Sequence, residues 1–107
     1  MAAGDVYVIY NSSANASIVA VGDIAHAVTF YNGDDTVALL KNDVVIDVIG
    51  VIGTDPGTNW VVGTGATIEF TLVRKSSVKT GVTTFDPSQW DVYSQDTVSY
   101  LGSHTQD

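Results

Sequence analysis

The chain has 107 residues, which is enough for one domain and too short for two. Hydrophobic residues make up 45% and charged residues 15%, so the chain is too apolar and too weakly charged to be disordered. Twelve acidic residues against four Lys and Arg give a net charge of −8, which argues against direct binding of nucleic acid. No apolar run is long enough to cross a bilayer, so membrane insertion is not expected. The absence of Cys excludes disulfides and thiolate nucleophiles.

Residues branched at Cβ dominate the chain and predict strands. Val, Ile and Thr account for 36 of the 107 residues, against four Leu, and such side chains pack well on a pleated surface. The first strand is expected at residues 5–10 (DVYVIY). A second is expected at residues 28–31, and it runs into a turn at residues 32–35 (NGDD), where Gly and Asn tolerate positive φ.

The middle of the chain predicts a hairpin followed by a long strand. Residues 36–41 and 44–49 flank Asn42 and Asp43, which favours a tight primed turn between two strands. Residues 50–59 contain three Gly and one Pro, so an irregular loop is expected there. A short strand at residues 60–62 and the longest strand, at residues 66–75, should follow.

Helical segments are few and short. Residues 14–20 could form one or two turns after a Ser or Asn cap, and residues 86–90 fit a single turn with Pro87 at the first helical position. Many short strands separated by turn signals predict one all-β domain over residues 1–107, built as a sandwich or a barrel.

Several segments in a fixed order resemble the lamin-tail domain, and most closely its bacterial branch. They are residues 30–39 (FYNGDDTVAL), 45–50 (VIDVIG), 71–78 (TLVRKSSV), Trp90 and residues 101–105 (LGSHT), within a match over about residues 7–104. The resemblance implies an immunoglobulin-like antiparallel β-sandwich, and the sequence itself shows no catalytic constellation. The resemblance also implies an extracellular or cell-surface location, although the chain itself shows no signal peptide.

The chain lacks the strand region with which the family pattern opens, and this difference affects the kind of partner that we expect. Lamin-tail domains normally open with a further strand region, and this chain begins after it, so either the chain is a fragment or it folds with an uncovered sheet edge. An open edge presents unpaired N–H and C=O groups to any other strand. We therefore expect a protein partner or self-association as a homodimer or higher oligomer.

Two neighbouring carboxylates are candidates for a metal site. Asp34 and Asp35 follow an Asn-Gly step, and Ca²⁺ prefers clusters of carboxylate and carbonyl oxygens. Their spacing does not match an EF-hand loop, and Asp side chains also accept backbone N–H bonds in ordinary turns. We expect no cofactor and interpret both residues as turn residues, with calcium as the alternative.

Asp47 is unusual because it lies within an apolar strand. Strict alternation places it on the face of Val45 and Ile49, where a partly buried carboxylate needs a donor. Arg74, one of only four cations, is the expected ion-pair partner because its guanidinium bonds carboxylates bidentately. We interpret this pair as structural.

The aromatic residues suggest a second class of function. Trp60 and Trp90 could form a surface for carbohydrate or peptide if they converged on one exposed face, although aromatics in a small sandwich more often pack inside. The sequence thus favours a non-catalytic interaction module. The alternatives are a carbohydrate- or ligand-binding β-sandwich with a structural calcium and, ranked lower, an enzyme that uses Asp34, Asp35 and Asp47.

Overall fold

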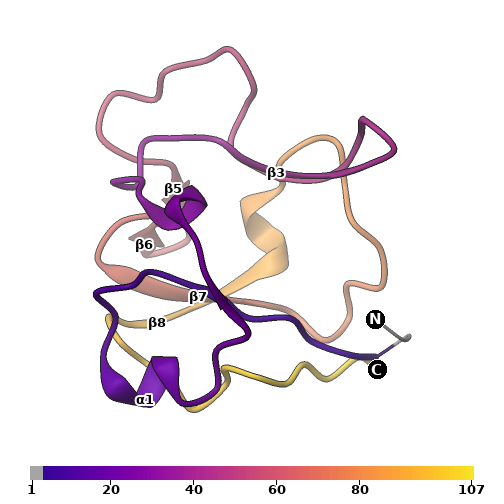
Figure 1. Cartoon of the computed structure of the whole chain (residues 1–107). Helices are drawn as coiled ribbons and strands as arrows, with labels where there is room; N and C mark the ends of the chain where they lie inside the picture. The colour runs from indigo at the N-terminus through magenta and orange to yellow at the C-terminus, as the bar shows by residue number, and fades with distance from the viewer. Residues whose placement is uncertain (1–3) are drawn as a thin grey trace.

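Paired short strands make up most of the regular structure. A computed structural model describes residues 4–107 (Figure 1). Its elements in chain order are β1 (Ile9–Tyr10), α1 (Ala16–Val19), β2 (Ile24–Ala25), η1 (Ala27–Thr29), β3 (Val37–Lys41), β4 (Val44–Ile49), β5 (Val61–Val62), β6 (Gly65–Ala66), β7 (Phe70–Arg74), η2 (Pro87–Gln89) and β8 (Trp90–Ser94). The strands form four two-stranded sheets, of which β1–β2 is parallel and the other three are antiparallel.

The β3–β4 hairpin forms where the sequence predicted it. Asn42 and Asp43 have φ values of 50° and 65°, the left-handed pair that a type I′ turn requires. The register shifts between Leu39 and Leu40, so that Ile46 is an extra residue on β4. This bulge interrupts the strict alternation assumed from the sequence.

The longest predicted strand, residues 66–75, is divided in two. Gly65–Ala66 pairs with β5, and a new strand begins at Phe70 and pairs with β8. Glu69, just before Phe70, has φ of 63°, a conformation that an extended strand cannot contain. Prediction of one continuous strand was therefore wrong. In Figure 1, β7 and β8 cross the lower half of the molecule and β3 the upper half.

The N-terminal third contains less strand than predicted. Only Ile9–Tyr10 of residues 5–10 is strand, and the predicted strand at residues 28–31 is largely replaced by the 3₁₀ turn η1. His26 caps this turn, because its Nδ1 accepts a hydrogen bond from the Val28 N–H at 2.9 Å. This side-chain hydrogen bond engages a backbone N–H that would otherwise be available to a neighbouring strand, although the β-branched residues of this segment favour strand.

The two predicted helical turns are present in short form. Helix α1 covers Ala16–Val19, and η2 covers Pro87–Gln89 with Pro at its start. Asp86 caps η2 by accepting a hydrogen bond from the Ser88 N–H at 3.0 Å. The irregular loop at residues 50–59 also appears as predicted.

The chain is compact, but its fully enclosed core is small. The radius of gyration is 13.7 Å, close to the ~13 Å expected for a folded chain of about this length. Within the described residues the buried hydrophobic side chains are Val8, Val48, Val62 and Ala66. The fold is therefore β-rich and globular, with much apolar surface left in contact with solvent.

Candidate functional site

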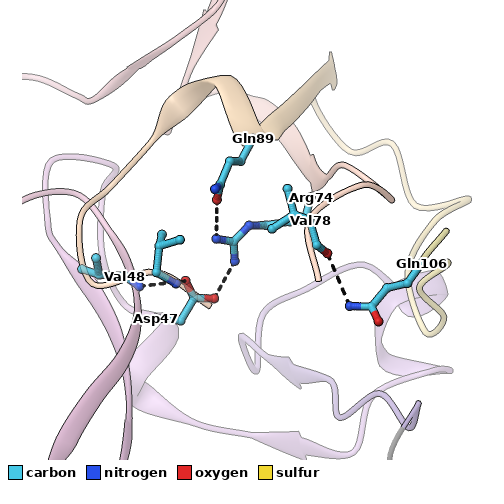
Figure 2. Close-up of polar contacts among 7 residues, drawn as sticks. Asp47, Val48, Arg74, Val78, Gln89 and Gln106 are labelled. Atoms are coloured by element: carbon cyan, nitrogen blue, oxygen red, sulfur yellow. Dashed lines mark hydrogen bonds and ion pairs between the residues drawn. The ribbon is translucent and has the colours of Figure 1, made fainter. Parts of the chain in front are cut away.

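The polar centre of the molecule is the Arg74 side chain, which joins three parts of the chain (Figure 2). Arg74 ends β7, and its Nη1 donates to Asp47 Oδ2 on β4 at 2.5 Å. Its Nη2 donates to Gln89 Oε1 in η2 at 2.7 Å. The structure thus brings Asp47 and Arg74 together and adds Gln89, which no sequence signal indicated.

Asp47 is held as a carboxylate by several donors. Burial raises its pKa, but the hydrogen bond from Arg74, the backbone N–H of Val82, the charge of Arg74 and the N–H of Val48 together lower it below the usual value. The Val82 and Val48 N–H groups bond Asp47 Oδ1 at 3.1 and 3.0 Å. Both oxygens are satisfied by the protein, which is the arrangement of a structural anchor rather than of a poised acid or base.

Arg74 is also stacked on an aromatic ring. Its guanidinium carbon lies 4.8 Å from the centroid of the Trp90 ring. The Arg74 side chain is only 14% exposed, and its buried Nε has no hydrogen-bond partner. An open hollow of about 290 Å³ lies beside the pair and is also bordered by Lys79 and His104.

The two tryptophans have separate roles. Trp60 donates from Nε1 to the Asp35 carbonyl oxygen at 3.0 Å and meets the Phe85 ring edge-on at 6.3 Å. Trp90 packs under Arg74 instead. Both rings are half-buried. Trp90 borders hollows of about 290, 240 and 990 Å³, and Trp60 borders none of these three, so the two rings have different surroundings.

Asp34 and Asp35 border one open hollow of about 430 Å³, together with Asp55. No group of three His, Asp or Glu side chains suited to a metal ion occurs among the residues that the structure describes. Asp55 is engaged as a turn residue, since its Oδ1 accepts from the Gly57 N–H at 2.8 Å. Asp47 lies elsewhere, bonded to Arg74, so the three candidate acids do not converge.

The feature that the sequence analysis did not locate is the extent of exposed apolar surface. On the β3–β4 hairpin, Leu39 is 61%, Leu40 52% and Val44 63% exposed. Strand β3 pairs only with β4 among the described strands, so the outer edges of this hairpin are not in a ladder. An apolar surface beside open strand edges is a typical site for another protein chain.

Comparison of the chain with protein-family models, with curated proteins and with solved structures gave no match. In residues 4–107 no helix has the length and apolar character needed to cross a membrane.

Proposed function

We propose that this chain is a non-catalytic interaction module of the lamin-tail type, folded as an immunoglobulin-like β-sandwich. Its role is to associate with another protein or with further copies of itself, outside the cell or at its surface. The ordered resemblance of residues 30–39, 45–50 and 71–78 supports the family and the location. The β-rich globular fold, with antiparallel hairpins and few helical residues, is compatible with that architecture.

The observation that carries the proposed role is the imbalance between buried and exposed apolar side chains. The buried hydrophobic side chains of the described residues are three valines and one alanine, while larger side chains such as Phe30 (65% exposed), Ile52 (63%) and Leu39 (61%) face solvent. Association of another chain with such a surface is favourable in free energy, because it removes apolar area from water. Binding to a protein partner therefore supplies the burial that the isolated fold lacks.

The chemistry of the Arg74 centre supports a structural rather than a catalytic reading. Asp47 and Arg74 bond one another, and Gln89, the Trp90 ring and two backbone N–H groups also contact the pair. A general acid or base needs access to a substrate proton, and a carboxylate with both oxygens occupied offers none.

The proposal is tested by the solution mass together with the binding of an apolar fluorescent dye. Light scattering over a range of protein concentrations should give either a mass that grows towards a dimer or larger assembly, or a monomer that binds the dye strongly. Both results would mean that the apolar surface is available for association. A monomer at every concentration that binds no dye would contradict the proposed function.

A further inference from the structure

A long hollow separates the N-terminal segment, residues 6–11, from strand β7. Its volume is about 990 Å³, at the upper end of the ~300–1,000 Å³ that ligand sites usually occupy. The N-terminal segment borders one side of it, Glu69 and β7 border another, and Figure 1 shows both in the same lower part of the molecule. Residues of the C-terminal segment between Gln95 and His104 border the rest. An occupant between the N-terminal segment and β7 would lie beside two backbones.

The wall formed by β7 presents an open hydrogen-bonding edge. Lys75 N–H bonds the Gln89 carbonyl oxygen, which continues the β7–β8 register of Arg74 opposite Trp90. In an antiparallel ladder, bonded and non-bonded pairs alternate, so Thr71 and Val73 face β8. The backbone groups of Phe70, Leu72 and Arg74 consequently point away from β8. No backbone hydrogen bond between these three residues and another segment occurs within the described chain.

The N-terminal wall is open in the same way. The Val8 carbonyl oxygen accepts from the N–H groups of Asp23 and Ile24, and the Tyr10 carbonyl accepts from His26 N–H. Val8 and Tyr10 therefore direct their backbone groups towards β2, and alternation turns those of Tyr7 and Ile9 to the opposite side. The hollow is thus bordered by two strands that each have a partner on one side only.

The charges along the hollow define the chemistry of its occupant. Asp47 and Arg74 border one end and neutralise each other. Exposed apolar side chains also border the hollow, among them Tyr7, Ile9 and Phe70, which are 54%, 48% and 43% exposed. Glu69 and Asp96 border the other end, beyond the Phe70–Ser94 pair, and both are exposed. An apolar extended segment with a basic end fits this order of charges.

We propose that the hollow accepts an extended strand of another protein, with apolar side chains in its middle and Lys or Arg at the end near Glu69 and Asp96. The inserted strand pairs with the outer edges of β1 and β7 and joins the two small sheets into one. Such strand addition takes its affinity from main-chain hydrogen bonds and its specificity from alternate side chains. This inference rests on the proposed function and names the class of partner.

Charge favours another protein over a second copy of this chain. Each copy carries a net charge of −8 and only four Lys and Arg, so two copies repel one another over their surfaces. A partner strand with a basic end meets the exposed acids Glu69 and Asp96 of the hollow instead.

The test uses a synthetic peptide of alternating valine and threonine with lysines at one end, made in both chain directions and labelled for fluorescence anisotropy. A matched peptide carries N-methylated valines, which keep the side chains and remove backbone donors. A third replaces the lysines by glutamates. We expect the N-methylated and glutamate peptides to bind at least about tenfold more weakly than the lysine peptide. Hydrogen exchange at the amides of Ile9, Phe70 and Leu72 should slow in the complex, whereas amides of the β3–β4 hairpin stay unchanged.

Two identical substitutions locate the binding surface. Ile9→Ala removes apolar contact area from the hollow, and Ile52→Ala makes the same change at an exposed position in the loop at residues 50–59. Ile9→Ala should weaken binding of the lysine peptide about tenfold, and Ile52→Ala should leave it unchanged. Circular dichroism would verify that both variants are folded, and the peptide comparison does not depend on either variant.

Equal affinity for the N-methylated peptide, or no slowing of exchange at Ile9, Phe70 and Leu72, would overturn the strand-addition proposal. The proposal would also be overturned if exchange at those amides slowed with rising protein concentration in the absence of peptide. The occupant would then be a second copy of the chain. If no peptide binds while the chain still assembles or binds the apolar dye, the hollow is not the interaction site and the proposed function stands. If the chain neither assembles nor binds the dye, the proposed function fails independently.

Discussion

Arg74 and Asp47 connect the two longer antiparallel strand pairs of the molecule, with 2.5 Å between the guanidinium Nη1 and the carboxylate Oδ2. Among the described strands, β7 pairs only with β8 and β4 only with β3, so no β-ladder joins the two pairs there. The ion pair spans the gap between them, and the Val82 N–H bonded to Asp47 attaches a third segment. This polar centre therefore contributes to the relative placement of the two strand pairs.

Removing the charge of Asp47 should destabilise the fold. Asp47→Asn leaves Arg74 with an uncompensated charge while its side chain is only 14% exposed, and we expect a loss of about 2 kcal/mol in the free energy of unfolding. Urea unfolding followed by Trp fluorescence would measure it. Asp91→Asn, a change at an exposed position of β8, is the matched control and should cost less than about 0.5 kcal/mol. Equal stability of the two variants would show that the pair contributes little.

The same pair predicts the direction of a pH effect. Hydrogen bonds and the charge of Arg74 lower the pKa of Asp47 in the folded chain, so its stabilisation is complete above the ordinary carboxyl pKa of about 4. It is lost as the pH falls through the lowered value. Asp86 also has a lowered pKa, chiefly because of the hydrogen bond from Ser88, and adds a loss in the same direction.

Comparing the wild-type chain with Asp47→Asn separates the effect of Asp47 on the pH dependence of stability from that of Asp86. The difference in unfolding free energy between them should be constant from neutral pH down to about pH 5 and should shrink below about pH 4. Chemical denaturation at a series of pH values provides the measurement. A difference that does not change on acidification would mean that Asp47 titrates alike in the folded and unfolded chains.

Local signals account for the parts of the fold that the sequence predicted well. Asn42 and Asp43 can adopt the left-handed conformation, which fixed the position of the β3–β4 turn without reference to the rest of the chain. Asp86 and Pro87 similarly define the start of η2. Arg74 was identified as the partner of Asp47 because an acidic residue in an apolar strand needs a donor and the chain has few cations.

The elements that were missed depend on contacts distant in sequence or on competing local bonds. Glu69 lies in a stretch whose residue types favour strand, and the neighbouring residues give no turn signal that would predict its φ of 63°. Strand β8 was not predicted, although the alternation of Trp90 and Val92 with Asp91 was a usable signal. The hollow beside β7 could not be predicted, because it arises from the placement of two segments about 60 residues apart along the chain.

Gly81 is a position where any side chain should disturb the Arg74 centre. A Cβ there would meet the Ile46 carbonyl oxygen and would lie 2.9 Å from Asp47 Cβ. Gly81→Ala should therefore push this segment from β4, weaken the Val82–Asp47 bond and cost about 3 kcal/mol. Gly57→Ala, where φ is 90° and nothing lies within 4 Å, tests backbone strain alone and should cost about 1 kcal/mol. Thermal unfolding of both variants gives the comparison, and a smaller effect at Gly81 would contradict the packing described for it.

The hairpin turn offers a substitution that should stabilise the chain. Asp43 has φ of 65°, and Gly adopts this conformation without the steric cost borne by other residues. Asp43→Gly creates the Asn-Gly pair favoured in type I′ turns and should raise the unfolding free energy by about 0.5 kcal/mol. Asn42→Ala, at the neighbouring position with φ of 50°, should lower it by about 1 kcal/mol. Denaturant unfolding would detect both shifts, and a loss of stability in Asp43→Gly would argue against a type I′ turn.

Calcium should leave the stability of the chain unchanged. Asp34, Asp35 and Asp55 border an open hollow, but no set of three acidic or His side chains suited to a metal ion occurs among the described residues. Ca²⁺ takes six to eight oxygen ligands, and isolated exposed carboxylates in salt solution hold it weakly. Thermal unfolding with millimolar Ca²⁺ should therefore give the same midpoint as sodium chloride at equal ionic strength. A rise in the midpoint that Asp35→Asn abolishes would instead establish a calcium site at this hollow.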